Sequence, residues 1–212
     1  MTAAGKIIGC PRRMGGPVLI LTRVNPLTHL MAGWLVAESA PVLTPRERAL
    51  VAWAGVIPDL DGLGMPVEML TRNSRDPLLW FTEYHHTLGH NLGFALFCTT
   101  MAFVLAKRRA LTALLTAVSF HLHLLGDLIG ARGPDGEQWP IPYGLPFTNR
   151  WQWVWAGQWP LNSWQNIVIT VAAMALIFHL ARRRGYSPVG LFSRRADGVF
   201  IATLRRRFPL PR

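Results

Sequence analysis

The sequence is short of charged residues, and acids are the scarcest. Charged side chains make up 16% of the chain, against about 25% in an average soluble domain. Only 11 of the 212 residues are Asp or Glu, against 22 Lys or Arg, which gives a formal net charge of +11. Half of the residues are hydrophobic, which excludes a disordered basic tail. A chain that is both basic and strongly apolar indicates a membrane protein rather than a nucleic-acid-binding domain.

Cysteine is also nearly absent. The two cysteines, Cys10 and Cys98, are far apart and form no CxxC pair. The sequence therefore supports neither a thiolate zinc site nor a disulfide framework. It also contains no phosphate-binding loop and no nucleotide fingerprint.

Five apolar stretches predict the helices of the fold. Two are short, and three reach the length of about 20 residues that a membrane span needs once their flanks are included. The stretches are 30–43, 49–57, 91–106, 110–126 and 166–181. We expect an all-α, polytopic membrane protein with two antiparallel helical hairpins and a further C-terminal membrane helix. The two short stretches could be re-entrant, and a soluble helical bundle is the alternative.

Basic residues gather at one set of ends of these stretches. Arg46 and Arg48 separate the first two, residues 107–109 separate the third and fourth, and residues 182–184 follow the fifth. Short basic loops stay in the cytoplasm, so the turns and the tail should share that side. The tail carries nine Arg and one Asp, which favours membrane lipids with anionic headgroups as its partner over nucleic acid.

The chain divides into three parts by composition. They are an atypical N-terminal segment (1–26), a helical membrane domain (27–181) and a basic cytoplasmic tail (182–212). Six of the nine tryptophans lie between Trp139 and Trp164, where prolines interrupt any helix. We expect a loop there, opposite the basic turns, with its tryptophans at the headgroup level or over a substrate.

Histidine and aspartate stand at the other ends of the apolar stretches. Because each hairpin turns at a basic loop, the ends that carry them should meet. They are His29 before the first stretch, Asp59 and Asp61 after the second, His85, His86 and His90 before the third, and His123 and Asp127 after the fourth. An Asp at a helix C-terminus opposes the helix dipole, so capping explains these acids poorly. Imidazole and carboxylate together favour Zn, Mn, Fe or Ni over Ca or Mg.

Spacing narrows the choice of ligands. His123 and Asp127 are four residues apart, on one face of a helix. His86 and His90 share that spacing, whereas His85 and His90 are about 140° apart on an ideal helix. Geometry alone therefore favours His86, unless His85 lies in the loop before the helix. His121 is assigned to packing or to support of a ligand.

The ordered motifs resemble the YdjM-type family of bacterial inner-membrane proteins, which are described as metal-dependent hydrolases. The matching segments are His29, Pro-Asp-Leu-Asp at 58–61, His-His-Thr-Leu-Gly-His-Asn at 85–91, His-Leu-Leu-Gly-Asp at 123–127 and Pro-Ile-Pro-Tyr at 140–143. The resemblance covers roughly residues 27–147 and places His85 and His90 on the two histidines of the third motif. His86-Thr87 replaces the family's Arg-Gly, which removes a phosphate contact, and Gly89 and Asn91 replace Thr and Ser.

Together these patterns predict one or two divalent ions, zinc first and Mn or Fe next. The expected ligands are His29, Asp59, Asp61, His85, His90, His123 and Asp127, and seven exceed the four of one tetrahedral zinc, which suggests two ions. The resemblance implies a multi-pass hydrolase of the bacterial inner membrane. We expect the site toward the face opposite the basic turns.

For the reaction we expect a metal-activated water to attack a phosphoester or lipid-like substrate. Asp61 would accept the proton, and His86 would donate to the leaving group or hold a phosphate. The alternative is a non-catalytic, metal-stabilised membrane module that binds a lipid or protein partner. Transport of metal or protons ranks last, because it predicts polar residues through the helix centres, whereas the His and Asp residues stop at one end.

Overall fold

A computed structural model describes residues 26–133 and 136–210. Within these ranges the chain forms helices and no β-strand, so the all-α prediction is confirmed. The prediction for residues 1–26 lies outside the described part except at Pro26. The elements are α1 Pro26–Glu38, α2 Pro45–Ala54, the 3₁₀ helix η2 Ile57–Leu63, α3 Gly64–Thr71, α4 Trp80–Tyr84, α5 Leu92–Leu105, α6 Arg109–Gly130, α7 Trp164–Arg184, the 3₁₀ helix η3 Pro188–Leu191, and α8 Arg194–Arg207.

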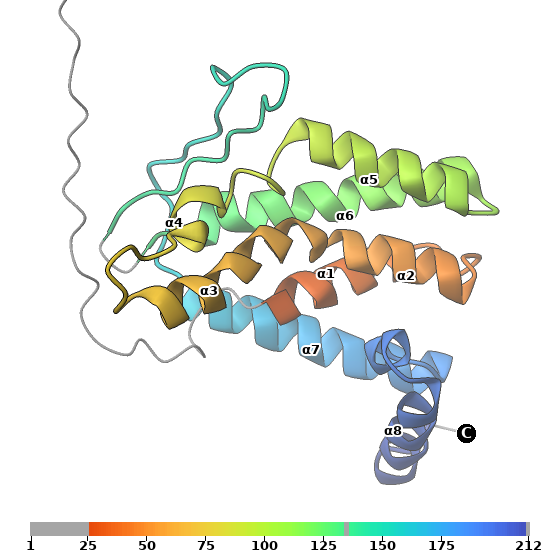
Figure 1. Ribbon diagram of the computed structural model, residues 1–212. Helices are drawn as coiled ribbons and strands as arrows, with labels where there is room; N and C mark the ends of the chain where they lie inside the picture. Colours follow the sequence, from red (N-terminus) through yellow and green to blue (C-terminus); the bar gives the residue numbers. More distant parts are fainter. Residues whose placement is uncertain (1–25, 134–135, 211–212) are drawn as a thin grey trace, which may run out of the picture.

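Five helices form the body of the molecule. Helix α1 packs against α2, α6 and α7, and α6 also packs against α2 and α5. Figure 1 shows these helices side by side, with α8 lying across the C-terminal end of α7. Helix α6 therefore lies at the centre of the packing, and it is also the longest helix of the described residues.

The two basic turns meet at one end of this body. Thr44 caps α2 through a capping box, in which its hydroxyl accepts from the Glu47 N–H and Glu47 accepts from the Thr44 N–H at 2.8 Å. The same Glu47 carboxylate accepts from the backbone N–H of Arg108, which precedes α6, at 2.6 Å. One buried acid thus joins the start of α2 to the start of α6.

Glycine allows α1, α2 and α6 to approach closely. A Cβ on Gly33 would lie 2.6 Å from the Ala52 carbonyl oxygen and 2.8 Å from Ser119 Oγ. A Cβ on Gly55 would lie 2.6 Å from the His29 carbonyl oxygen. Both positions leave no room for a side chain, so the ends of α1 and α2 are held against α6 at fixed spacing.

Two described helices, α6 and α7, are long and apolar enough to cross a membrane, with 22 and 21 residues. A third candidate is α2 continued by residues 57–71, which is bent by 53° at the break. Helix α5 is shorter than the predicted span over 91–106. Its 14 residues rise only about 21 Å, against about 30 Å of hydrocarbon. It is short because Asn91 caps its start, with Oδ1 accepting from the Phe94 N–H at 2.9 Å, and the helix ends at Ala106.

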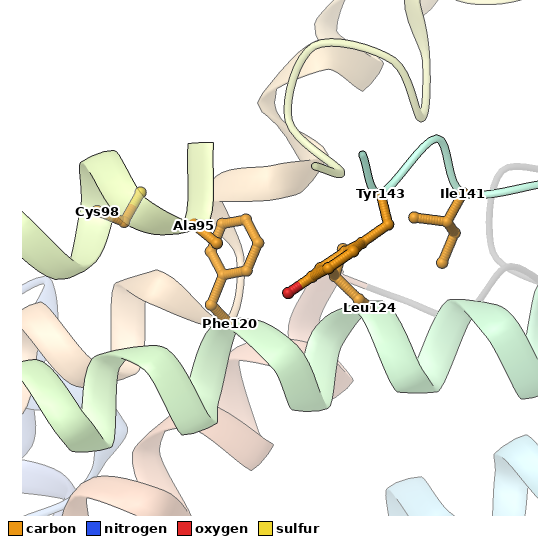
Figure 2. Packing of buried hydrophobic residues seen from close by; sticks show 6 residues of the cluster. All are labelled: Ala95, Cys98, Phe120, Leu124, Ile141 and Tyr143. Atoms are coloured by element: carbon orange, nitrogen blue, oxygen red, sulfur yellow. The ribbon is translucent and has the colours of Figure 1, made fainter. Parts of the chain in front are cut away.

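The segment rich in tryptophan is a loop, as predicted. No helix interrupts the described residues between α6 and α7. Ile141 pairs with Trp153 through backbone hydrogen bonds, and the Tyr143 ring stacks on the Trp153 ring at 4.1 Å. Figure 2 shows Ile141 and Tyr143 facing α6, beside Phe120 and Leu124. The loop is therefore packed onto the end of α6 that lies away from the basic turns.

Candidate metal centre

Four side chains converge at the end of α6 away from the basic turns. They are Asp59 of η2, His90 of the segment before α5, and His123 and Asp127 of α6. Each offers one ligand atom, and these four atoms all lie within 4.8 Å of one another. The four residues form a cluster that could hold a metal ion, hereafter the His/Asp cluster.

The donor atoms of the cluster are very close together. The Nε2 atoms of His90 and His123 are 3.1 Å apart. Asp127 Oδ2 lies 3.2 Å from the first and 3.0 Å from the second. Asp59 Oδ1 lies 3.9 Å and 3.6 Å from the same two nitrogens.

Local structure explains why these residues meet. One helical turn separates His123 from Asp127, so both project from one face of α6. Gly89 lies against η2, where a Cβ would overlap the carbonyl group of Pro58. Only glycine permits this approach, which brings His90 beside the residue that follows Pro58, Asp59.

Three outer contacts orient the ligand atoms. The Nδ1 atom of His90 lies 3.1 Å from Asp61 Oδ2, and that of His123 lies 2.9 Å from the Gly55 carbonyl oxygen. His29 Nε2 lies 3.3 Å from Asp127 Oδ1. Because both imidazoles use Nδ1 for these outer partners, their Nε2 atoms face the cluster. Metal-ligating histidines commonly have such a carboxylate or carbonyl partner.

The buried carboxylates of the cluster would be stabilised by a positive charge between the four donor atoms. Asp59 Oδ2 and Asp127 Oδ2 are buried, and neither has a hydrogen-bond partner with good geometry among the described residues. Burial lowers the pKa of His90, but the carboxylates of Asp127 and Asp61 outweigh burial and raise that pKa to about 9. The buried acids thus attract either a proton on His90 or a cation between the four donors. The nitrogen and oxygen donors fit a divalent transition metal or zinc.

Asp61 and His85 lie one layer further out. Asp61 Oδ1 is 2.9 Å from His85 Nδ1, and Asp61 Oδ2 accepts from the Gly89 N–H at 3.1 Å in addition to contacting His90. Both carboxylate oxygens are therefore engaged, and the Asp61 side chain is 1% exposed. His85 stacks on Phe81 with ring centroids 4.4 Å apart. The structure does not bring either residue among the four converging ligand atoms.

His86 has an unusual backbone. Its φ is +67°, the one positive φ at a non-glycine residue in the described ranges, and such strain tends to occur at functional sites. Its side chain is buried, its Nδ1 has no hydrogen-bond partner among the described residues, and its ring centroid lies 4.3 Å from that of His90. Burial holds the pKa of His86 well below its usual value. His86 is thus a neutral imidazole beside the cluster.

The remaining histidines have separate positions. His121 Nε2 lies 2.8 Å from the Tyr143 hydroxyl, and its Nδ1 lies 2.8 Å from the Ala117 carbonyl oxygen. His121 therefore helps to attach the loop after α6. His179 is exposed near the C-terminal end of α7.

Sequence patterns missed two residues near the cluster. Buried Gln158 donates from Nε2 to the Asp127 carbonyl oxygen at 2.8 Å and accepts from the Trp139 N–H at 3.3 Å. The Trp139 ring lies edge-on to His85 and His86, with centroids 5.4 Å and 5.0 Å away. Gln158 belongs to no motif, so nothing in its sequence context marked it. The local excess of tryptophan was the only signal for Trp139.

The fold and the cluster together define a helical membrane protein with a candidate metal centre. The chain belongs to the YdjM inner membrane protein family, whose model matches residues 24–191. This match includes all four residues of the His/Asp cluster and extends through α7 and η3. It confirms the family indicated by the motifs, and with the apolar helices it supports a membrane location. No curated protein and no solved structure matches the chain.

Proposed function

We propose that the chain is a membrane-bound, metal-dependent hydrolase. The observation that carries the proposal is the convergence of two imidazole nitrogens and two carboxylates, of which His90, His123 and Asp127 are also held by outer partners. A structural role alone does not require two carboxylates packed against two imidazoles without good hydrogen-bond geometry.

The ligands of the proposed ion are Asp59, His90, His123 and Asp127. Two nitrogen and two oxygen donors suit zinc, with Mn or Fe as alternatives. Asp61 and His29 hold His90 and Asp127 in place. Under this assignment a single ion accounts for the cluster, and the larger ligand set expected from the sequence divides into ligands and their supports.

The chemistry follows from the residues around the ion. When bound, such an ion supplies Lewis acidity and activates water for attack. The Asp59 side chain is 17% exposed, whereas those of the other three ligands are at most 5% exposed, so substrate reaches the cluster from the η2 side. Asp59 Oδ2 has no hydrogen-bond partner in the described ranges and is placed to accept a proton. Asp61 is fully engaged and is assigned to positioning.

His86 is the proposed substrate-contacting residue. Its neutral ring lies between His90 and Trp139 and has a nitrogen without a partner. Its N–H can donate a hydrogen bond to the oxygen of a leaving group or of a phosphate. In the family pattern an Arg stands at this position, and His86 offers a hydrogen-bond donor there without the charge of the Arg.

A phosphoester with a lipid-like portion is the proposed substrate class. Apolar side chains are exposed on the elements that follow Asp59, among them Leu60, Leu63, Leu70 and Trp80. They provide an apolar surface beside the cluster, where a bound ion would attract the phosphate of a substrate. The cluster lies at the end of α6 opposite the basic turns, so we place it toward the non-cytoplasmic face.

Metal analysis of the detergent-purified full-length protein tests the centre. Asp59→Ala and His123→Ala should each lose the ion, as measured by elemental analysis. The control His179→Ala, which removes an exposed imidazole from α7, should retain it. Full retention in both cluster variants would contradict the proposal.

Hydrolysis is tested next with a small soluble phosphodiester and with phospholipid vesicles. His86→Asn removes the imidazole but tolerates positive φ; it should keep the metal and lose turnover. If the wild-type protein binds metal and hydrolyses nothing in this screen, the non-catalytic membrane module is favoured instead.

One observation favours transport as a second candidate function. The hydroxyls of Thr112, Thr116 and Ser119 are buried and have no hydrogen-bond partner among the described residues. They continue the line of His123 and Asp127 along α6, so buried hydroxyls extend toward the middle of the helix although the His and Asp residues gather at one end. Metal uptake into proteoliposomes that Thr116→Val abolishes would favour transport, whereas turnover without uptake would favour the hydrolase.

A further inference from the structure

A groove lies far from the His/Asp cluster, between the end of α7 and α8. Figure 1 shows α8 crossing the C-terminal end of α7. The groove has a volume of about 290 Å³ and is lined by Phe178, His179, Arg182, Leu204 and Phe208. Phe178, Leu204 and Phe208 make most of its lining apolar, and Arg182 is the one cationic side chain in it.

The groove is fixed by specific contacts between the two helices. Gly185, with φ +82°, ends α7 and turns the chain toward η3 and α8. Arg205 then donates from α8 to the terminal carbonyls of α7, at 2.9 Å to Arg182 O and 3.3 Å to Arg183 O. Ala181 packs with Ile201 and Leu204 beneath them. Helix α8 is thus anchored on α7 rather than being a loose basic tail.

The arginines of this region divide into engaged and available groups. Arg184 pairs with Glu38, and Arg205 caps α7. Arg182 has no salt bridge among the described residues, and its Nε is buried without a hydrogen-bond partner there. Asp197, the one acid after α7 among the described residues, accepts from the Ser187 hydroxyl at 2.6 Å. A free guanidinium therefore faces an apolar groove with no acid to neutralise it.

We propose that this groove binds one anionic phospholipid of the bilayer. Its phosphate would pair with Arg182, and an acyl chain would lie against Phe178 and Phe208. Phe178 is one turn before Arg182 in a helix able to span the membrane, so the two side chains start about 6 Å apart along the axis. An apolar contact one turn inside a cationic contact matches the order of acyl chain and headgroup at a membrane surface.

The basic face of α8 strengthens the choice of an anionic lipid. Arg194, Arg195, Arg206 and Arg207 are exposed and make no salt bridge with described residues. Exposed Val199 and Phe192 lie on or beside the same helix. Basic residues with apolar neighbours are typical of helices that lie in the interface of an anionic membrane. The groove then defines one specific site within this broader surface.

The test uses native mass spectrometry of the full-length protein in detergent. Dioleoyl phosphatidylglycerol is titrated against dioleoyl phosphatidylcholine. The wild-type protein should retain one phosphatidylglycerol that phosphatidylcholine does not replace. Arg182→Gln should weaken that binding about 10-fold or more, since it removes a charge-assisted hydrogen bond.

Arg183→Gln is the matched control, because it makes the same charge change at the adjacent, exposed position. It should bind the lipid as the wild type does. Phe208→Ser tests the apolar wall and should also weaken binding. Metal content and melting temperature verify that all variants are folded, since none of these residues is near the His/Asp cluster.

Three outcomes would overturn the proposal. Equal loss in Arg182→Gln and Arg183→Gln would mean diffuse electrostatic attraction and no defined site. Equal retention of phosphatidylcholine, which has the same phosphate but no net charge, would mean that the groove does not select an anionic lipid. Tighter binding of a single-stranded RNA than of phosphatidylglycerol would assign the basic surface to nucleic acid.

Discussion

Asp61 offers the sharpest test of how the His/Asp cluster is organised. Its carboxylate contacts His90 Nδ1 at 3.1 Å, His85 Nδ1 at 2.9 Å and the Gly89 N–H at 3.1 Å. If Asp61 positions His90 and is not a ligand, its replacement should weaken metal binding without removing the ion altogether. If it is a ligand, Asp61→Asn should lose the ion completely, as we expect of Asp59→Asn.

The expected magnitude follows from these contacts. Loss of a partner behind a ligand typically costs 10- to 100-fold in metal affinity, about 1.4 to 2.7 kcal/mol. In Asp61→Asn the amide oxygen can still accept from His90 and Gly89, and its NH₂ group can donate to a His85 tautomer with a free Nδ1. We expect about a 10-fold loss for Asp61→Asn, because only the negative charge behind His90 disappears. Asp61→Ala leaves buried donors unpaired and should lose about 100-fold.

The assay is competition for zinc against a chelator of known affinity, with the purified full-length protein. Asp76→Asn is the matched control, since it makes the same chemical change at an exposed residue and should bind zinc normally. Melting temperatures of Asp61→Asn and the wild type in excess chelator measure the effect of the substitution on the metal-free fold, which is separated in this way from its effect on zinc affinity.

Two results would refute this reasoning. Unchanged affinity in Asp61→Asn would mean that the carboxylate does not act through His90. Complete loss of the ion, equal to that in Asp59→Asn, would place Asp61 among the ligands and support the larger set expected from the sequence.

Other predictions concern stability. Gly33→Ala should destabilise the protein by about 1–3 kcal/mol, because its Cβ would meet Ala52 O and Ser119 Oγ; the control Gly198→Ala, with no atom near its Cβ, should be neutral or slightly stabilising in α8. Thermal unfolding in detergent measures both, and an equally stable Gly33→Ala would contradict the close packing. Glu38→Gln should cost about 1.5–3 kcal/mol, because buried Glu38 accepts from both Arg184 and Tyr186; an unchanged melting temperature would argue against this attachment of α7. Zinc at about 100 times its Kd should stabilise the fold by about 2.7 kcal/mol, and chelator should reverse the shift; no shift on either treatment would argue against metal binding by the native fold.

The sequence predicted the elements better than it predicted the roles of individual residues. The approximate positions of the five main helices and the loop rich in tryptophan follow from local pattern, because apolar runs and prolines act over a few residues. The length of α5 was overestimated because an apolar run says nothing about the Asn91 cap that begins the helix. The family resemblance then identified the segments that meet.

The division between ligands and supporting residues depends on contacts across the fold. Asp59 and Asp61 look equivalent in sequence, yet only Asp59 lies among the four converging ligand atoms, while Asp61 contacts His85, Gly89 and the outer nitrogen of His90. Helical spacing favoured His86 as the partner of His90, and that argument failed because residues 85–91 are not a helix. The positive φ of His86 and the contact of Gln158 with Asp127 arise from packing that no local pattern encodes.

A segment of the chain between η2 and His85 leaves the His/Asp cluster and returns to it. The contacts that hold the two ends of this segment together do not depend on how long the segment is. Gly89 lies against Pro58, and Asp61 contacts His85, Gly89 and His90. Residues 64–84, which form α3, α4 and their connection, contribute none of the four cluster residues. Insertions or deletions there can change the apolar surface next to Asp59 while the donors keep their places. Exchange of this segment between members of the family should therefore alter the apolar surface and leave the four donors of the His/Asp cluster in place.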